Sequence, residues 1–192
     1  MAEDIEGQVR ENEELDAERE GRRRLALAQV RQYPDPVLRL RAREVTEFDD
    51  ALVSLVDRMG RLMSDARGVG LAAPQIGLTQ RLLVYRIDEE SPLVALVNPT
   101  IVETSEEVET GDEGCLSLGA ATIVVPVERP VRITVEGVDP TGEPLRTEAE
   151  GLEARVIQHE LDHLDGVLTI DRTTPEAKRD ALAKLRPQPV LG

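Results

Sequence analysis

Residues 151–166 read GLEARVIQHELDHLDG, and this stretch decides the fold that the sequence predicts. Its apolar residues and histidines recur at helical spacing, and Gly166 is a typical residue at which a helix stops. One stripe of this helix consists of Leu152, Val156, His159 and His163. Since residues at such spacings share a helix face, the apolar half and the histidine half point the same way. The stretch therefore predicts a buried helix that carries a metal ion and also walls an apolar pocket.

Both histidines of the chain lie in the segment His159-Glu160-Leu161-Asp162-His163. The HExxH pattern lets two histidines bind one ion and brings the glutamate next to the open coordination position. There Glu160 can take a proton from water and pass it on. The alternative is a solvated helix with two stray histidines, but the specificity of the pattern favours the metal site.

The third ligand is open to three interpretations. The longer zinc-protease spacing HExxHxxGxxH fits as far as Gly166 but then has Thr169 in place of a third histidine. A downstream glutamate is the second possibility, and Glu176 is the nearest candidate, although it is close in sequence. The third is Cys115, the only cysteine, which we prefer. Two imidazoles and a thiolate would leave a position for water, as in catalytic sites.

Two further segments bear on the chemistry. In Glu113-Gly114-Cys115-Leu116-Ser117, the Leu116 N–H is a candidate oxyanion donor. Ser117 is expected to be structural, because no third histidine remains to activate it. Residues 68–77 read GVGLAAPQIG, which is a weak phosphate-loop signal because no Lys-Ser/Thr follows. This loop could bring the Gln75 amide to a reacting carbonyl, or it could be a helix end followed by a turn.

The order of the remaining patterns indicates an α+β fold. Asp49 and Asp50 are candidate caps of an amphipathic helix that runs through Leu52 to Met63. Strand-like runs follow at 81–87, 93–97, 122–127 and 131–138, and a last helix begins at Pro175 and ends near Pro187. Because helix, strands, helix and helix do not alternate as βαβ units, we expect a mostly antiparallel sheet packed around the central metal-binding helix. The amphipathic helix lies N-terminal to it and the last helix C-terminal.

Composition limits the function classes. The 192 residues include 38 acidic and 23 basic ones, which argues against a DNA-binding protein or a coat on an anionic membrane. One cysteine cannot form an internal disulfide, and no apolar stretch predicts a membrane span or a signal sequence. We therefore expect a cytoplasmic protein. Residues 1–24 are expected to be a disordered or loosely helical acidic extension, residues 25–187 a catalytic domain and residues 188–192 a tail.

Taken in order, GVGLAAPQIG at 68–77, EGCLS at 113–117 and QHELDHLDG at 158–166 resemble the three signature motifs of peptide deformylases. The similarity extends from about Val30 to about Arg172 and includes Tyr33-Pro34-Asp35-Pro36-Val37-Leu38-Arg39. The resemblance implies removal of formate from the N-formylmethionine of nascent polypeptides, a step of N-terminal processing in protein biosynthesis. It also implies Fe²⁺ as the usual metal, with Zn²⁺ or Ni²⁺ as substitutes.

By motif position, the resemblance implies a role for each site residue. The metal ligands would be Cys115, His159 and His163. The catalytic groups would be Glu160 as general acid/base, with Gln75 and the Leu116 N–H holding the oxyanion. The substrate would contact Val69, Gly70, Leu152 and Val156, which is in keeping with the stripe on the helix.

The sequence departs from the family pattern at three places: Gly119 stands where a proline is usual, the stretch Ala120–Arg129 looks longer, and the N-terminal extension is additional. Two other functions remain as alternatives. A metallopeptidase would cleave internal peptide bonds, and a silent metal-binding or ribosome-docking protein would be expected to lack Glu160 or Gln75. Basic residues of the last helix, Lys178, Arg179, Lys184 and Arg186, could contact ribosomal RNA or form a solvated face.

Overall fold

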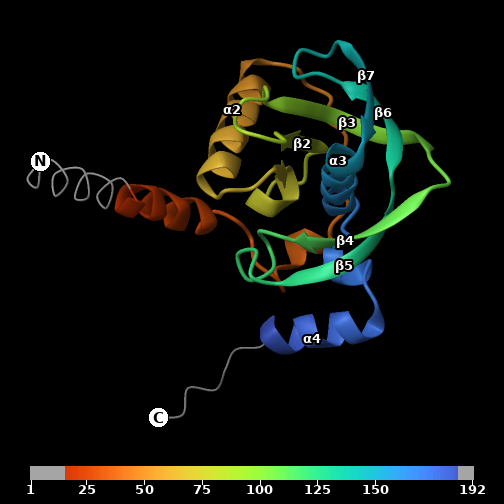
Figure 1. The fold of residues 1–192 in the computed structure, drawn as a ribbon. Coiled ribbons are helices and arrows are strands. Elements are labelled where there is room, and N and C mark those ends of the chain that lie inside the picture. Colours follow the sequence, from red (N-terminus) through yellow and green to blue (C-terminus); the bar gives the residue numbers. More distant parts are fainter. Residues whose placement is uncertain (1–15, 186–192) are drawn as a thin grey trace, which may run out of the picture.

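A central helix, α3 (Gly151–Leu164), lies between a five-stranded sheet and a two-stranded hairpin (Figure 1). The computed structural model describes residues 16–185. All strand pairs are antiparallel, so the predicted α+β class and sheet type are confirmed. α3 contacts strands of both sheets, which makes it the core helix that its sequence predicted.

The five-stranded sheet has the order β1-β2-β3-β6-β7, and β4 pairs with β5 in the hairpin. The strands are β1 (Gly70–Ala72), β2 (Leu82–Tyr85), β3 (Val94–Thr104), β4 (Val108–Gly114), β5 (Val124–Pro130), β6 (Arg132–Val138) and β7 (Pro144–Glu150). Strand β1 is an edge strand of its sheet, and both hairpin strands have a free edge.

Strand β2 shows how the sequence builds two layers. All four of its residues are buried, since helices cover both faces of the sheet here. Leu82 and Val84 join the cluster formed with α2, while Leu83 and Tyr85 join the cluster formed with α3. This alternation is the period of two that a strand imposes on its side chains. A continuous apolar run is therefore what a doubly covered strand requires.

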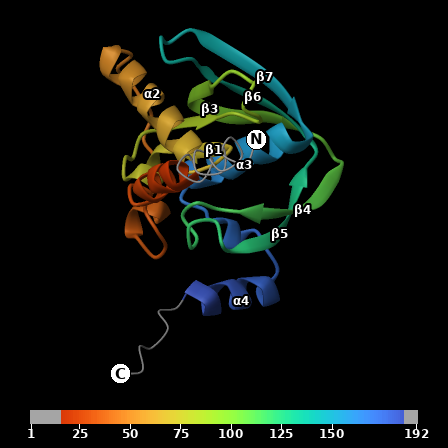
Figure 2. The same cartoon turned by 60° about the vertical axis from the view of Figure 1, so that its left-hand side comes forward.

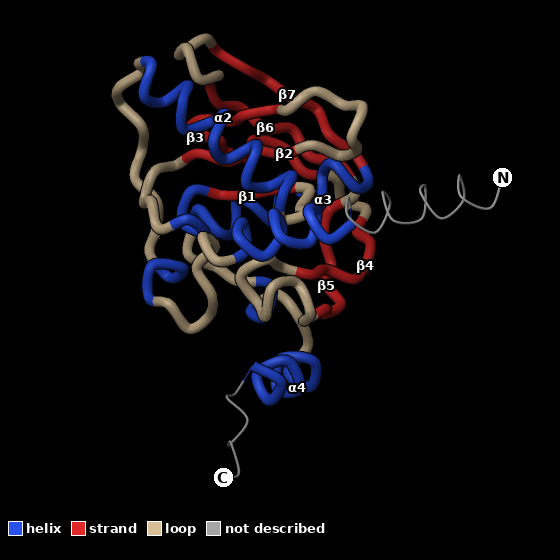
Figure 3. Tube along the Cα trace, turned by 90° about the vertical axis from the view of Figure 1, so that its left-hand side faces the viewer, coloured by secondary structure: helices blue, strands red, loops and turns tan. Residues whose placement is uncertain are grey.

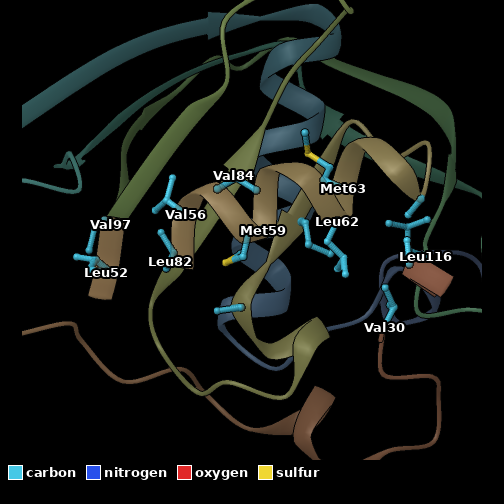
Figure 4. Packing of buried hydrophobic residues seen from close by; sticks show 14 of the residues in the cluster. Val30, Leu52, Val56, Met59, Leu62, Met63, Leu82, Val84, Val97 and Leu116 are labelled. Carbon is cyan, nitrogen blue, oxygen red and sulfur yellow. The ribbon is translucent and has the colours of Figure 1, made fainter. Parts of the chain in front are cut away.

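Helix α2 (Asp50–Asp65) begins at the predicted cap, where the Asp49 carboxylate accepts a hydrogen bond from the Leu52 N–H. Its apolar stripe packs on β2 and reaches Val30 and Leu116 (Figure 4). Met59 and Met63 are fully buried in this cluster, as core-filling residues are. The helix thereby anchors the loop that follows it.

Several element boundaries differ from the prediction. The run at 93–97 continues to Thr104 in β3, and the runs at 81–87, 122–127 and 131–138 correspond to β2, β5 and β6. Strands β1, β4 and β7 were not predicted, because their sequences GLA, VETGDEG and PLRTEAE are short or mostly polar. The last helix, α4 (Pro175–Leu185), lies beyond the hairpin (Figure 3). Its predicted end near Pro187 falls outside the described residues.

An N-terminal helix covers residues 16–27. It lies beside the C-terminal end of α2 (Figure 2) and buries Ala26 there. Residues 16–24 thus follow the helical alternative expected for the acidic extension, while residues 1–15 and the tail 188–192 lie outside the described part. The boundary at residue 25 stays a prediction. Among the described helices, none is long and apolar enough to cross a membrane.

Candidate metal centre

The structure brings Cys115, His159 and His163 together, with their ligand atoms within 4.8 Å of one another. α3 supplies both histidines from one face, and Cys115 follows the last residue of β4 directly. Cys115 Sγ lies 3.2 Å from His163 Nε2, and both side chains are buried. Neither Thr169 nor Glu176 belongs to this group of ligand atoms.

The donor set suits a divalent metal ion. Burial alone would raise the pKa of the Cys115 thiol, but the facing imidazoles of His163 and His159 bring this pKa well below its usual value. The thiolate is the form of cysteine that binds metals. One thiolate and two imidazoles are borderline to soft donors that Fe²⁺, Ni²⁺ and Zn²⁺ accept, and three protein ligands leave a position open for water or substrate.

A buried carboxylate, Glu113, orients one of the ligands. Its Oε2 accepts a hydrogen bond from His159 Nδ1 at 2.9 Å, which turns the other ring nitrogen toward the cluster. Arg129 donates to both Glu113 oxygens, at 2.6 and 2.9 Å. Burial raises the pKa of this carboxyl, but the bonds from Arg129 and His159 outweigh it and hold the pKa at about 2. Such a partner fixes the tautomer and the orientation of a ligating histidine.

The Glu113 contact continues into a network of charged residues. Arg129 also donates to Asp162 on α3 at 3.0 Å, and Arg172 donates to the same carboxylate. Arg155 adds a bond to Glu113 at 2.9 Å. Buried charges are tolerated only when paired in this way. This network was not predicted from the sequence. The position of Glu113 two residues before Cys115, on an extended segment, was nevertheless a signal that both side chains face one side.

Glu160 lies at the centre of the site. It is only 4% exposed, and its Oε2 has no hydrogen-bond partner among the described residues. Burial raises the pKa of this carboxyl, so a proton can reside on it closer to neutral pH. A side chain at Gly70 would lie 2.9 Å from both Cγ and Cδ of Glu160. The glycine therefore makes the room in which this carboxyl sits.

The candidate oxyanion donors face the same cluster. The Gln75 side chain is buried in the short turn Ala73–Ile76, and its Oε1 accepts a hydrogen bond from the Ala72 N–H at 2.8 Å. Its amide nitrogen then points toward Cys115 Sγ and Ser117 Oγ, at 3.8 and 3.4 Å. No acceptor within the described chain takes the Leu116 N–H. Ser117 is fully buried, as expected for a structural hydroxyl.

A cavity of about 230 Å³ opens beside the cluster. Its walls include Val69, Gly70, Leu152 and Val156, together with Gln75, Cys115, Leu116, His159 and Glu160. Val156 is buried, whereas Val69 and Leu152 are 43% and 55% exposed and form the outer part of the cavity wall. A larger polar groove of about 740 Å³ shares no lining residue with this cavity. The predicted site residues thus converge on the smaller cavity, with His163 behind it.

Comparison with known proteins identifies the family. The sequence model described as "Polypeptide deformylase" matches residues 27–179. The chain belongs to the peptide deformylase family. The peptide deformylase of Thermotoga neapolitana is 50% identical over 155 residues, which cover 81% of this chain and 92% of that protein. The peptide deformylase of Natranaerobius thermophilus is 47% identical over 148 residues, which cover 77% and 93%.

Solved structures of peptide deformylases show the same fold. The crystal structure of the Thermotoga maritima enzyme has a TM-score of 0.72 at 47% identity and covers 76% of this chain and 97% of that one. The Synechococcus elongatus enzyme in complex with actinonin has a TM-score of 0.77 at 39% identity and covers 83% and 91%. The chain is accordingly a metal-dependent hydrolase that removes the formyl group from formylated nascent peptides.

One departure from the usual peptide deformylase pattern has a structural reason. Gly119 has φ +59°, a value that proline, fixed near −65°, cannot adopt. Ala120 and Ala121 continue this left-handed turn with φ of 55° and 66°. The Ala121 N–H then bonds back to the Cys115 carbonyl at 3.0 Å, and Ala121 reaches the cavity wall. Residues 119–121 therefore fold back onto the cysteine loop at the edge of the cavity, and the expected effect of the stretch 120–129 on the rim stays a prediction.

Proposed function

We propose that Cys115, His159 and His163 hold the catalytic ion of this peptide deformylase, and that the ion in the cell is Fe²⁺, with Zn²⁺ or Ni²⁺ as substitutes. The observation in support is the convergence of the only cysteine and both histidines of the chain within 4.8 Å. When bound, the ion would polarise the formyl carbonyl and lower the pKa of water. The protein fixes its position through Glu113 and the charges behind it.

Glu160 is the general acid/base in this proposal. It takes a proton from the attacking water and delivers it to the leaving amine of methionine. The single observation that carries this assignment is the buried Oε2, which has no hydrogen-bond partner in residues 16–185, on a residue that lines the cavity together with Cys115 and His159. Gln75 and the Leu116 N–H donate to the oxygen that becomes negative as the formyl carbon turns tetrahedral.

We further propose that the formylated peptide binds as an extended strand between two free strand edges. Gly70 of β1 and Gly114 of β4 both line the cavity, and each belongs to a strand with an unpaired edge. Backbone pairing with such an edge is a common mode of peptide binding. The methionine side chain would then enter between Val69, Leu152 and Val156, where apolar contacts favour it.

The decisive experiment combines metal analysis with product analysis. Anaerobically purified protein is expected to contain one equivalent of iron and to release formate from formyl-Met-Ala-Ser, while the internal peptide bonds stay intact. Cleavage of an internal bond would favour the metallopeptidase alternative. One bound metal without formate release would favour a silent metal-binding protein.

The cellular compartment of the protein and its contact with the ribosome are also proposals. We place the reaction in the cytoplasm, where formylated nascent chains emerge, and take residues 25–187 as the catalytic domain. A ribosome contact through α4 is supported by Lys178, Arg179 and Lys184, but Lys178 already pairs with Asp171 at 2.8 Å and Arg179 lies 3.9 Å from Glu176. These pairs reduce the charge available for RNA.

A further inference from the structure

A positively charged side chain, that of Arg67, lies at the mouth of the substrate cavity. Arg67 lines this cavity, and its side chain is 58% exposed. The other arginine of the cavity wall, Arg155, is fixed by bonds to Glu113 and to the carbonyls of Val127 and Glu109. The ion-pair partner of Arg67 within the described residues is Glu20, at 3.7 Å. Arg67 is therefore the cavity-lining cation that can turn toward a ligand.

The backbone at Arg67 is strained. The end of α2 forms a Schellman motif, in which the Gly68 N–H bonds to the Met63 carbonyl and the Arg67 N–H to the Ser64 carbonyl. The residue between cap and closing bond must be left-handed, and Arg67 has φ +59°. Glycine is favoured at this position because a side chain there costs free energy. Backbone strain next to a functional site is often part of how that site works.

The partner of Arg67 comes from the N-terminal helix. This helix covers residues 16–27, and only its last residue falls within the part of the chain that matches the family, residues 27–179. Its buried Ala26 fixes it beside α2 (Figure 2). Glu20 lies one to two turns earlier and is itself 57% exposed. A pair between two exposed side chains at this distance is weak and can be exchanged. A carboxylate that enters the mouth can therefore take the place of Glu20.

We propose that Arg67 selects substrates with an acidic side chain at the second or third residue after the formyl group, and that Glu20 competes with that side chain. The inference rests on the proposed function, because it requires the peptide to leave the cavity past Arg67. Asp112 on β4 also lines the cavity and is exposed, so a basic side chain placed next to it would gain instead. An acidic side chain gains where the peptide passes Arg67, so we expect the preference at one position after the formyl group and not at both.

The test compares formyl-Met-Asp-Ala, formyl-Met-Ala-Asp and their lysine and glutamine counterparts, all as C-terminal amides, at low salt. The wild type is expected to have kcat/KM about 1.5- to 5-fold higher for aspartate than for lysine at one of the two positions, which is the range of exposed ion pairs. Arg67→Gln should bring this ratio close to one, and Arg67→Glu should invert it. Glu20→Gln should raise the ratio, and the matched control Glu18→Gln should leave it unchanged.

The possible outcomes distinguish the charge preference from the deformylase activity on which it rests. Formate release from the glutamine peptides without any charge ratio in the wild type would overturn the selection while leaving the deformylase activity intact. An equal loss on all peptides in Arg67→Gln would show that Arg67 acts on the shape of the site. A ratio that ignores Glu20→Gln but follows Arg67→Gln would overturn the competition. Arg67→Gly should lose the ratio and gain thermal stability, and a lower midpoint would refute the strain argument.

Discussion

Gly70→Ala tests whether the position of Glu160 controls the reaction. The added methyl carbon would lie 2.9 Å from both Cγ and Cδ of Glu160, whereas ordinary contacts begin near 3.4 Å. The carboxyl must therefore retreat by roughly half an ångström to one ångström, because the methyl carbon is fixed to the backbone. A displacement of ~1 Å at a reacting group can cost ~10²-fold in rate. We expect kcat for formyl-Met-Ala-Ser to fall about 10- to 100-fold.

The fold and the metal content should survive this substitution, since the obstructed atoms belong to a side chain and not to the backbone. Gly68→Ala is the matched control, because its new carbon meets the end of the Leu116 side chain, Cδ1 at 2.9 Å, which can rotate away. We expect that control to stay within a few fold of the wild type. Circular dichroism and metal analysis accompany the formate assay for both variants.

A double-mutant cycle completes the test. If Gly70 acts through Glu160, then adding Gly70→Ala to Glu160→Gln should cost little beyond Glu160→Gln alone, because coupled residues are not additive. Fully additive losses would refute this reasoning, as would a kcat within about threefold of the wild type in Gly70→Ala. Loss of the metal in Gly70→Ala would instead mean that the strand positions the ligands.

Four further outcomes are expected. Glu160→Gln should keep one metal ion and the affinity for the formylated peptide while turnover falls by ~10²–10⁴, and metal loss would contradict its assignment to proton transfer. Cys115→Ser should lose tight metal binding together with activity because a hydroxyl is a poor substitute for thiolate, and retained stoichiometric metal would exclude the cysteine as ligand. Glu113→Gln should weaken metal affinity by ~10–100-fold in chelator competition, whereas unchanged affinity would make Glu113 merely structural. The Fe²⁺ form should lose activity in air while the Zn²⁺ form persists, because zinc has no redox chemistry, and equal lifetimes would count against iron as the working metal.

The parts of the fold that the sequence predicted are those with local patterns. α2 and α3 follow from their apolar spacing, and Asp49 caps α2 as its position indicates. Strand β7 could not be found this way, because PLRTEAE is polar on most positions and only Ala149 is buried. It is a strand because β6 offers it seven consecutive pairing positions. Such pairing is a property of two distant segments and leaves little trace in either one.

The site divides in the same way. The metal ligands, the general acid/base and the amide of Gln75 lie within motifs, so their residue types and spacing predict their chemistry. Arg129 does not, since its two carboxylate partners are 16 and 33 residues away along the chain. The burial of Arg129 is explained by its place on β5, from which it links the hairpin to α3. A buried arginine with two carboxylates then stabilises both the ligand geometry and the contact between the hairpin and α3.

Residues at the mouth of the cavity tolerate substitution better than the charged residues behind the metal ligands. His159 is held by Glu113, which is held by Arg129, which also binds Asp162 on the helix that carries His159. This series of bonds ties His159 to buried charges, and Arg155 and Arg172 add further bonds to Glu113 and Asp162, so removing one member leaves a buried charge with fewer partners. Arg67 and Glu20 belong to no such series, and either can change at small cost to the fold. Substrate preference can therefore diverge at the mouth through single substitutions without disturbing the chemistry.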